Sequence, residues 1–256
     1  MAGIVEGKRV FLTGGGGNLG SATAKLLAKE GASVAVVDIS LQASEDVVAE
    51  INSNGGIAIA IQADVRNDNQ IFDAVAESVG EFGGLDTLIN NAGIMPHQDA
   101  SMLDADLDEW RAIYELNTLG TVTVSRHVVP HIKEAGGGSV INMSSFLAVI
   151  GCSYPQDAYT SSKGALSALT RSMSAQFGPH NIRVNAMAPG PILTAHVEQF
   201  FPDPAARALR LARVPLGRFG KPDDVAGLAT FLTSEWSSWI SGQVITLDGG
   251  ISINYV

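Results

Sequence analysis

The side chains best suited to acid–base chemistry are Tyr159 and Lys163, which stand four residues apart. On a helix, this spacing places both side chains on the same face. A free tyrosine has a pKa of about 10 and is a poor base at neutral pH. A neighbouring ammonium group favours the phenolate and lowers that pKa, so the tyrosine could accept a proton from a hydroxyl group. The pair therefore predicts general acid–base chemistry, provided that both residues lie on a helix.

A second candidate site is the glycine run in TGGGGNLG, residues 13–20. It follows an apolar run of strand length and precedes an Ala- and Leu-rich segment of helical period. The backbone N–H groups of such a turn, and the N-terminus of the helix after it, can bind a pyrophosphate. A flexible loop is the alternative, but four successive glycines at a strand-to-helix junction argue against it. The run predicts a dinucleotide site.

A carboxylate at the end of the next apolar run indicates which dinucleotide fits. Asp38 lies about 20 residues beyond the glycines, where a carboxylate can accept hydrogen bonds from both ribose hydroxyls of adenosine. The same carboxylate would repel a 2′-phosphate, and neither Gly15 nor Ile39 supplies a cation to offset that repulsion. The alternative is that Asp38 is only a turn residue at a strand end. The sequence predicts NAD(H) rather than NADP(H).

The elements that must position these residues alternate between apolar runs and segments of helical period, which predicts a parallel sheet with helices on both faces. We expect a single doubly wound, Rossmann-type α/β domain over residues 1–256 with seven, mostly parallel strands. Gly31 and Gly55 stand where helices should end. Pro189–Leu216 breaks the alternation, and we expect a mobile substrate lid at about 191–216. The predicted strands are Arg9–Thr13, Ser33–Asp38, Ile57–Asp64, Leu85–Asn90, Ser139–Met143, Ile182–Ala188 and Gln243–Leu247, and the predicted helices are Asn18–Glu30, Leu41–Asn54, Asn67–Phe82, Asp106–His131, Gln156–Phe177 and Pro222–Thr233.

Composition limits the partners and the compartment. Charged residues make up 16% of the chain, below the roughly 25% of typical soluble domains, which suggests a surface partly covered by partner subunits. The net charge of −10 argues against nucleic acid or an anionic membrane as a partner. Cys152 is the single cysteine, no apolar run reaches membrane-spanning length, and too few residues precede Arg9 for a signal peptide. We expect a soluble, cytoplasmic protein that acts on a small molecule.

Several motifs, weak individually, occur together in an order that resembles the classical short-chain dehydrogenase/reductase family from Lys8 to Gly250. The resemblance implies an oxidoreductase that transfers hydride between a nicotinamide cofactor and an alcohol or ketone. The motifs are the glycine turn, Asp64-Val65, Asn90-Asn91-Ala92-Gly93, Asn117, Ser144-Ser145, Tyr159 with Lys163, Pro189-Gly190 with Thr194, and Asp248-Gly249-Gly250.

The resemblance also implies residue roles. Tyr159 would be the general base, aided by the positive nicotinamide ring, and Ser145 would donate a hydrogen bond to the substrate oxygen. Lys163 would also bind the nicotinamide ribose, and Asn117 would hold a water for proton relay. In the cofactor site, Asp64 and Val65 would contact adenine, and Ile192 and Thr194 the carboxamide. The predicted cofactor-binding residues are Gly14, Asn18, Leu19, Asp38, Ile39, Asp64, Val65, Asn91, Ala92, Gly93, Tyr159, Lys163, Pro189, Gly190, Ile192 and Thr194.

Two positions depart from the family pattern. Asn18 stands where the pattern has glycine, and asparagine tolerates a left-handed backbone, so we expect the turn to survive and the amide to add a cofactor contact. Ser145 precedes Tyr159 by 14 residues, one more than is common in the family. An extra residue in Gly151–Asp157 explains this spacing better than a change to Ser144, which lies still farther away.

The predicted substrate wall is apolar and aromatic and contains no Arg or Lys. It therefore favours a neutral or cationic aryl or alicyclic secondary alcohol over a sugar phosphate or a carrier-bound acyl chain. For His97 and His196 the alternative is a surface position without substrate contact, and Cys152 is interpreted as a bystander thiol. The predicted wall consists of Ile94, Met95, His97, Phe146, Leu147, Cys152, Tyr154, Pro191, His196, Phe200 and Phe201.

The sequence offers three alternatives to this function. A polyol or sugar dehydrogenase would be better supported by a pocket richer in Asn, Gln and Asp. A non-catalytic NAD-binding regulatory protein could share the fold, but the intact Ser145, Tyr159 and Lys163 set argues against it. His127 and His131 are spaced like a metal-binding pair, yet no third ligand stands nearby and Pro130 is expected to interrupt the helix. We expect no metal.

The same sequence indicates an oligomer. After Lys163 the predicted helix continues as GALSALT, residues 164–170, which is small and apolar where a solvent-facing helix would carry Lys and Glu. The segments Gln243–Leu247 and Ile251–Val256 are also apolar, unless the sheet and lid of the same subunit cover them. Family members that form two-fold symmetric tetramers strengthen this expectation. We expect a homotetramer, with a dimer as the alternative.

Overall fold

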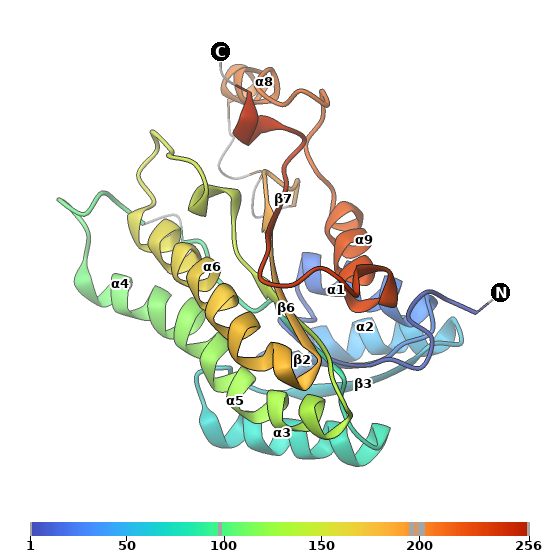
Figure 1. Ribbon diagram of the computed structural model, residues 1–256. Helices are drawn as coiled ribbons and strands as arrows, with labels where there is room; N and C mark the ends of the chain where they lie inside the picture. Colours follow the sequence, from blue (N-terminus) through green and yellow to red (C-terminus); the bar gives the residue numbers. More distant parts are fainter. Residues whose placement is uncertain (1, 97–98, 195–197, 199–202, 255–256) are drawn as a thin grey trace.

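The computed structural model contains a sheet of seven parallel strands in the order β3-β2-β1-β4-β5-β6-β7, with helices on both faces (Figure 1). It describes residues 2–96, 99–194, 198 and 203–254. The predicted doubly wound α/β fold is confirmed. The strands are β1 (Arg9–Thr13), β2 (Ser33–Asp38), β3 (Ile57–Gln62), β4 (Thr87–Asn90), β5 (Gly138–Met143), β6 (Ile182–Pro189) and β7 (Val244–Leu247).

The inner strands are largely apolar because each faces a helical layer on both sides, whereas the edge strands β3 and β7 are only partly buried. In β1, Val10 and Leu12 pack in the core formed with α1, α2 and α9, whereas Phe11 packs on the opposite face with α3, α5 and α6. All three side chains are fully buried. The helices are α1 (Asn18–Lys29), α2 (Leu41–Ser53), α3 (Asp68–Phe82), α4 (Leu107–Tyr114), α5 (Gly120–Glu134), α6 (Asp157–Phe177), α8 (Pro204–Leu211) and α9 (Pro222–Thr233), with short 3₁₀ turns at Phe146–Ala148, Gly178–His180, Glu235–Ser237 and Ile251–Ile253.

The long helix expected over Asp106–His131 is divided into α4 and α5 by a π-helical turn, Glu115–Leu119. The expectation that Pro130 interrupts the helix is wrong, because Pro130 lies inside α5, which continues to Glu134. Proline has a helical φ and removes only one backbone donor, and this loss falls in the penultimate turn. Gly31 and Gly55 follow the ends of α1 and α2, as predicted.

The strand order reverses between β1 and β4, so the loops after these two strands diverge and leave a crevice at the carboxyl edge of the sheet. The glycine run and Asn91–Gly93 occupy those two loops. The predicted site residues therefore meet at one edge of the sheet. Within the described part of the chain, the helices are too short or too polar to cross a bilayer.

Candidate active site

The carboxyl ends of the first six strands, β1 to β6, border a pocket of about 530 Å³, a volume typical of small-molecule sites. Every residue predicted to bind the cofactor lies on its wall, and so do three of the four predicted catalytic residues. These wall residues are Gly14, Asn18, Leu19, Asp38, Ile39, Asp64, Val65, Asn91, Ala92, Gly93, Ser145, Tyr159, Lys163, Pro189, Gly190, Ile192 and Thr194.

In the glycine turn, the backbone at Gly14 lies close to the backbone of the loop after β4. Gly14 has a φ of +63°, and a Cβ added there would lie 2.9 Å from Ala92 Cα, so both its conformation and its surroundings require glycine. Gly17 is the N-cap of α1 and has no side chain to occupy the N–H groups of the first turn. An anion could therefore bind these donors.

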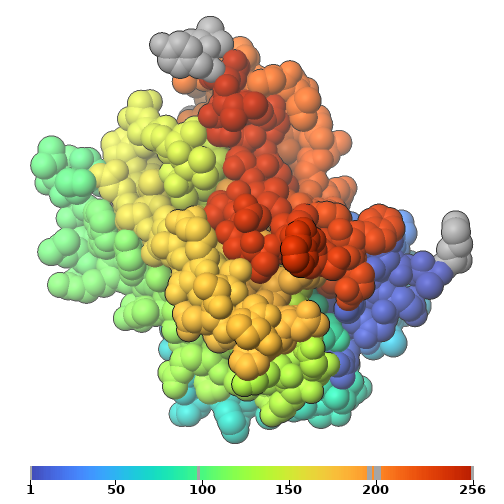
Figure 2. Space-filling model, viewed as in Figure 1, coloured from blue at the N-terminus to red at the C-terminus, as the bar shows by residue number. Residues whose placement is uncertain are grey.

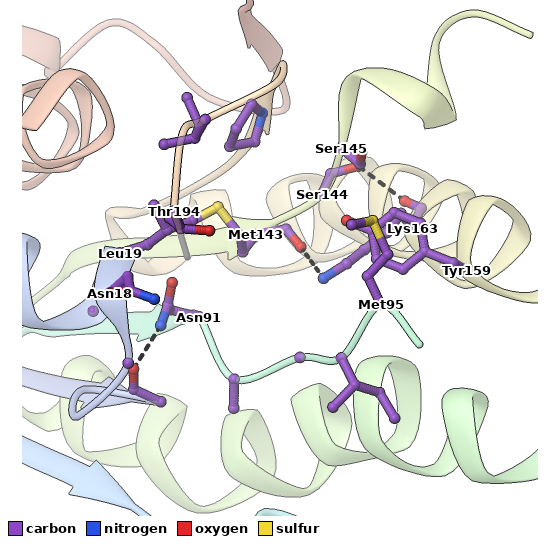
Figure 3. A pocket seen from close by; sticks show the side chains of 18 of the residues that line it. Asn18, Leu19, Asn91, Met95, Met143, Ser144, Ser145, Tyr159, Lys163 and Thr194 are labelled. Atoms are coloured by element: carbon purple, nitrogen blue, oxygen red, sulfur yellow. Dashed lines mark hydrogen bonds between the residues drawn. The ribbon is translucent and has the colours of Figure 1, made fainter. Parts of the chain in front are cut away.

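Asn18 does not adopt the left-handed backbone that we expected. It is the first residue of α1, and Asn181 is the non-glycine residue with positive φ in the described chain. The turn takes its positive φ at Gly14, so asparagine at position 18 is accommodated without strain. The Asn18 side chain lies at the pocket beside Leu19 and Asn91 (Figure 3).

Two carboxylates mark the end of the pocket formed by β2 and β3. Asp38 accepts hydrogen bonds from the backbone N–H groups of Gly16, at 3.0 Å, and Ser40, at 3.1 Å, which fix its side chain at the end of β2. Asp64 pairs with Arg66, whose Nη2 lies 2.6 Å from Asp64 Oδ2. The hydrogen bonds from Arg66 hold the pKa of the Asp64 carboxyl below its ordinary value. Both carboxylates can accept hydrogen bonds from a bound molecule.

The loop after β4 joins the glycine turn to the acid–base residues. Asn91 Nδ2 donates to the backbone oxygens of Thr13, at 3.1 Å, and Gly14, at 2.9 Å (Figure 3). A Cβ added to Gly93 would lie 3.1 Å from Lys163 Nζ and 3.2 Å from Asn117 Oδ1. Glycine at position 93 therefore lets this loop approach both side chains.

The structure brings Tyr159, Ser145 and Lys163 together. Tyr159 and Lys163 share one face of α6, as predicted, and the Ser145 side chain hydrogen-bonds to Tyr159 (Figure 3). Lys163 is 3% exposed, and its Nζ donates to the Met143 carbonyl oxygen at 2.7 Å and lies 5.8 Å from the centroid of the Tyr159 ring. The hydroxyl groups of Ser145 and Tyr159 at the pocket wall, with the buried amine of Lys163 nearby, can bind the oxygen of an alcohol and transfer its proton.

The chain matches a family model described as enoyl-(acyl carrier protein) reductase over residues 16–252. It belongs to the classical short-chain dehydrogenase/reductase family. The 3-oxoacyl-(acyl-carrier-protein) reductase of Thermotoga maritima is 38% identical over 97% of this chain and 99% of its own. The cis-4-hydroxycyclohexanecarboxylate dehydrogenase of Sinomonas cyclohexanicum is 34% identical over 93% of this chain and 94% of its own.

The 7α-hydroxysteroid dehydrogenase of Escherichia coli K12 is 35% identical over 96% of this chain and 94% of its own. A solved 7α-hydroxysteroid dehydrogenase, complexed with NADH and 7-oxo glycochenodeoxycholic acid, superposes with a TM-score of 0.91 at 35% identity, covering 96% of this chain and 94% of that one. As a member of this family, the protein is an oxidoreductase that binds a nicotinamide cofactor and interconverts alcohols and ketones.

In this short-chain dehydrogenase, burial has the largest effect on the pKa of Tyr159. Removal from water raises the pKa of Tyr159 above its ordinary value, and only the hydrogen bond from Ser145 acts in the opposite direction. The same desolvation lowers the pKa of Lys163 to about 8. In the protein by itself Lys163 is not among the groups that shift the Tyr159 pKa, and its amine donates to the Met143 carbonyl oxygen. That Lys163 favours the phenolate stays a prediction for the cofactor-bound enzyme.

The two adjacent serines have different surroundings. Ser144 is buried, where its hydroxyl donates to the Lys163 carbonyl oxygen at 2.9 Å and lies 2.8 Å from Ser167 Oγ. Ser145 instead bonds to Tyr159 and accepts from Leu147 N at 3.2 Å. These contacts favour the assignment of Ser145 to the substrate oxygen and leave Ser144 a packing role between β5 and α6.

We expect Ser145→Ala to lower kcat about 10²-fold, because it removes the donor to the substrate oxygen and the hydroxyl bonded to Tyr159. Ser144→Ala is the matched control, since it removes the same hydroxyl from the neighbouring position. It should lower the melting temperature and change kcat by less than about threefold. Steady-state kinetics on both variants give the comparison, and a larger kcat loss in Ser144→Ala would reverse the assignment.

Asn117 is placed differently from the other predicted catalytic residues. It lies in the π-helical turn, fully buried, and does not line the pocket. Its Oδ1 accepts from Ile94 N at 2.8 Å, and its Nδ2 donates to Ile94 O at 3.0 Å and to Ser162 Oγ at 3.1 Å. A π-turn is an irregularity often found at functional sites. Here the Asn117 side chain links the loop after β4 to Ser162, the residue before Lys163. Its role in holding a water stays a prediction.

On the substrate side of the pocket, the prediction that the wall contains no Arg or Lys is wrong. Arg210 of α8 lies on the wall, so the pocket does contain an arginine, and the argument for a neutral or cationic substrate loses its basis. Arg210 lies within the predicted lid, but the sequence does not show that this part of the lid forms a helix with Arg210 at the pocket wall. Ile94, Met95, Phe146, Leu147, Tyr154 and Pro191 line the pocket, Cys152 does not, and His97, His196, Phe200 and Phe201, with part of the predicted lid, lie outside the described residues.

The remaining histidine pair lies on α5, away from the pocket wall. His127 Nε2 is 2.8 Å from Asp68 Oδ1, and the His127 ring meets Phe72 edge to face. His131 Nδ1 is 3.2 Å from Glu134 Oε2. Each histidine thus has its own acidic partner.

Proposed function

We propose that the protein is an NAD-dependent dehydrogenase that interconverts an aryl or alicyclic secondary alcohol and its ketone. The observation that carries the proposal is the hydrogen bond between Ser145 and Tyr159, with Lys163 beneath them, on the wall of a largely apolar pocket. Two relatives named for alicyclic alcohols support the substrate class, and the related structure complexed with NADH supports the cofactor.

The nicotinamide cofactor, when bound, supplies the hydride acceptor or donor. The residues fit such a group, because the turn at Gly14 and the uncapped N-terminus of α1 offer N–H donors to a pyrophosphate, and Asp38 offers acceptors to a ribose. Ser145 donates a hydrogen bond to the substrate oxygen and holds it beside Tyr159. Tyr159 takes the hydroxyl proton during oxidation and returns it during reduction, and Lys163 binds the nicotinamide ribose and favours the phenolate.

We expect kcat/KM to favour NAD⁺ over NADP⁺ by at least about tenfold, because the Asp38 carboxylate repels a 2′-phosphate. Asp38→Ala should narrow this ratio by weakening NAD⁺ use and relieving the repulsion of NADP⁺. Asp46→Ala, which removes an exposed carboxylate on α2, is the charge-matched control and should leave the ratio unchanged. A wild-type preference for NADP⁺ would refute the carboxylate argument.

A substrate screen that follows NADH absorbance tests the activity itself. It should pair each aryl or alicyclic alcohol with its carboxylated analogue, since Arg210 lies on the wall. Turnover of polyols in place of these alcohols would favour a sugar or polyol dehydrogenase. NADH binding without turnover of any alcohol or ketone would favour the non-catalytic alternative.

We also propose a homotetramer as the working assembly. The C-terminal part of α6 and the segment leading into β7 lie side by side on one face (Figure 2), and Ser174 Oγ and Ser241 Oγ are 2.7 Å apart there. The small residues of α6 and the half-buried edge strand β7 would let a second subunit pack closely. Sedimentation at micromolar concentration should give a mass near four times 26.7 kDa. A fully active monomer would contradict this proposal.

A further inference from the structure

The helix that carries Tyr159 has no cap of its own. The N-cap residue of α6 is Gln156, and its side chain makes no capping hydrogen bond. A helix N-terminus leaves several N–H groups without intrahelical partners, and in most helices a Ser, Thr, Asp or Asn at the N-cap satisfies one of them. At α6, a residue far away in the sequence accepts hydrogen bonds from these N–H groups.

Asp99, from the loop after β4, caps α6 from outside. Its Oδ1 accepts from Ala158 N at 3.2 Å, and its Oδ2 accepts from the backbone N of Tyr159 at 2.8 Å. The side chain is 7% exposed. A carboxylate is seldom buried without partners, and here two N–H donors and the positive end of the helix stabilise its charge. Both oxygens are used, which only a carboxylate at this position provides.

Two further bonds tie the same loop to the first turn of α6. Asp157 N donates to the Ala100 carbonyl oxygen at 3.4 Å, and Asp157 Oδ2 accepts from Met102 N at 2.9 Å. We call this set of contacts, between residues 99–102 and 157–159, the α6 clasp. The loop that enters the clasp is the one that carries Ile94 and Met95 at the pocket wall. The clasp therefore ties residues 99–102 of this loop to the backbone of Tyr159 and its neighbours.

We propose that Asp99 is a positioning residue, which through the clasp holds Tyr159 at the substrate oxygen; this inference rests on the proposed function. The catalytic hydroxyl must lie within hydrogen-bond reach of the alcohol, and a small displacement of the first turn of α6 would move it. Asp99 does not line the pocket, so it acts through Tyr159 and not on the cofactor or substrate itself. Its effect should therefore fall on the chemical step and leave cofactor binding intact.

The kinetic test uses Asp99→Ala and Asp99→Asn, with Asp106→Ala and Asp106→Asn as matched controls. Asp106 caps α4 through a hydrogen bond from Asp108 N at 2.8 Å and is exposed, so its removal also costs a helix cap. We expect Asp99→Ala to lower kcat about 30- to 100-fold, with the Kd of NADH within about twofold. Asp99→Asn, which keeps one acceptor oxygen, should lie between Asp99→Ala and wild type, and both Asp106 variants should keep wild-type kcat.

Two readouts separate positioning from mere loss of folded protein. With deuterium at the carbinol carbon, the isotope effect on kcat should rise in the Asp99 variants, because the chemical step becomes slower relative to product release. Loss of folded enzyme would lower kcat in proportion to NADH-binding sites and leave the isotope effect unchanged, and that result would overturn the proposal.

Hydrogen exchange tests the clasp independently of turnover. The N–H groups of residues 158 and 159 should exchange faster in Asp99→Ala than in wild type or Asp106→Ala. Unchanged exchange would overturn the proposal on its own. A wild-type protein that oxidises no alcohol would instead refute the proposed function, while the exchange result still decides whether Asp99 holds the helix.

Discussion

Tyr159→Phe is expected to lower kcat by at least about 10³-fold while the Kd of NADH stays within about twofold. The substitution removes a single hydroxyl group, which is the proton acceptor in oxidation and the donor in reduction. The ring remains, so the packing around α6 and the position of Lys163 should be retained. Ser145 alone cannot replace the hydroxyl, because an aliphatic alcohol is a much weaker acid than a phenol and its alkoxide does not form to a useful extent at neutral pH.

Stopped-flow or steady-state kinetics at saturating cofactor, with NADH affinity measured by fluorescence titration, check this expectation. Tyr114→Phe on α4 is the matched control, since it removes the same group from a tyrosine that does not line the pocket. It should keep wild-type kcat. Retention of substantial activity by Tyr159→Phe would rule out Tyr159 as the general base.

The sheet could be predicted from the sequence because its inner strands are buried on both faces. Runs such as Ser33–Asp38 have no polar alternation, and the observed β2 has the predicted bounds. The cofactor wall could also be predicted, since residues such as Asp38 and Asn91 directly follow or end a strand, and parallel strands bring their carboxyl ends to one edge. Local signals were sufficient wherever a residue's position in its own element decides whether it reaches the pocket.

The features that could not be predicted depend on contacts between distant segments. The Met143 carbonyl that binds Lys163 is backbone, so no residue type signals it. Asp99 caps a helix that begins 58 residues later in the chain. The sequence around Asp99 does not distinguish it from any other acidic residue in a loop. The pKa of Tyr159 depends on how much water the folded pocket excludes, which spacing on a helix does not reveal. The spacing was sufficient to place both side chains on one face of α6, but it does not reveal how far burial shifts their pKa values.

Lys163→Ala should damage both binding and turnover, which distinguishes it from Tyr159→Phe. We expect kcat/KM to fall by about 10³-fold or more and NADH affinity to weaken at least about tenfold, because the amine is proposed both to bind the nicotinamide ribose and to favour the phenolate. The variant should also be less stable. Loss of the lysine amine leaves the Met143 carbonyl oxygen without the donor that now lies 2.7 Å away. An unpaired buried acceptor lowers the free energy of unfolding by about 1–3 kcal/mol.

Three measurements on Lys163→Ala separate these effects: the Kd of NADH, kcat at saturating cofactor, and the melting temperature. Lys133→Ala, which removes an exposed lysine from the last turn of α5, is the matched control and should change none of them. An unchanged Kd with a reduced kcat would refute the ribose contact but not the acid–base role. Weakened NADH binding with an unchanged kcat would mean that Tyr159 needs no help from the ammonium group. Because burial already raises the Tyr159 pKa in the protein alone, that second result would assign the activation of Tyr159 to the positively charged nicotinamide.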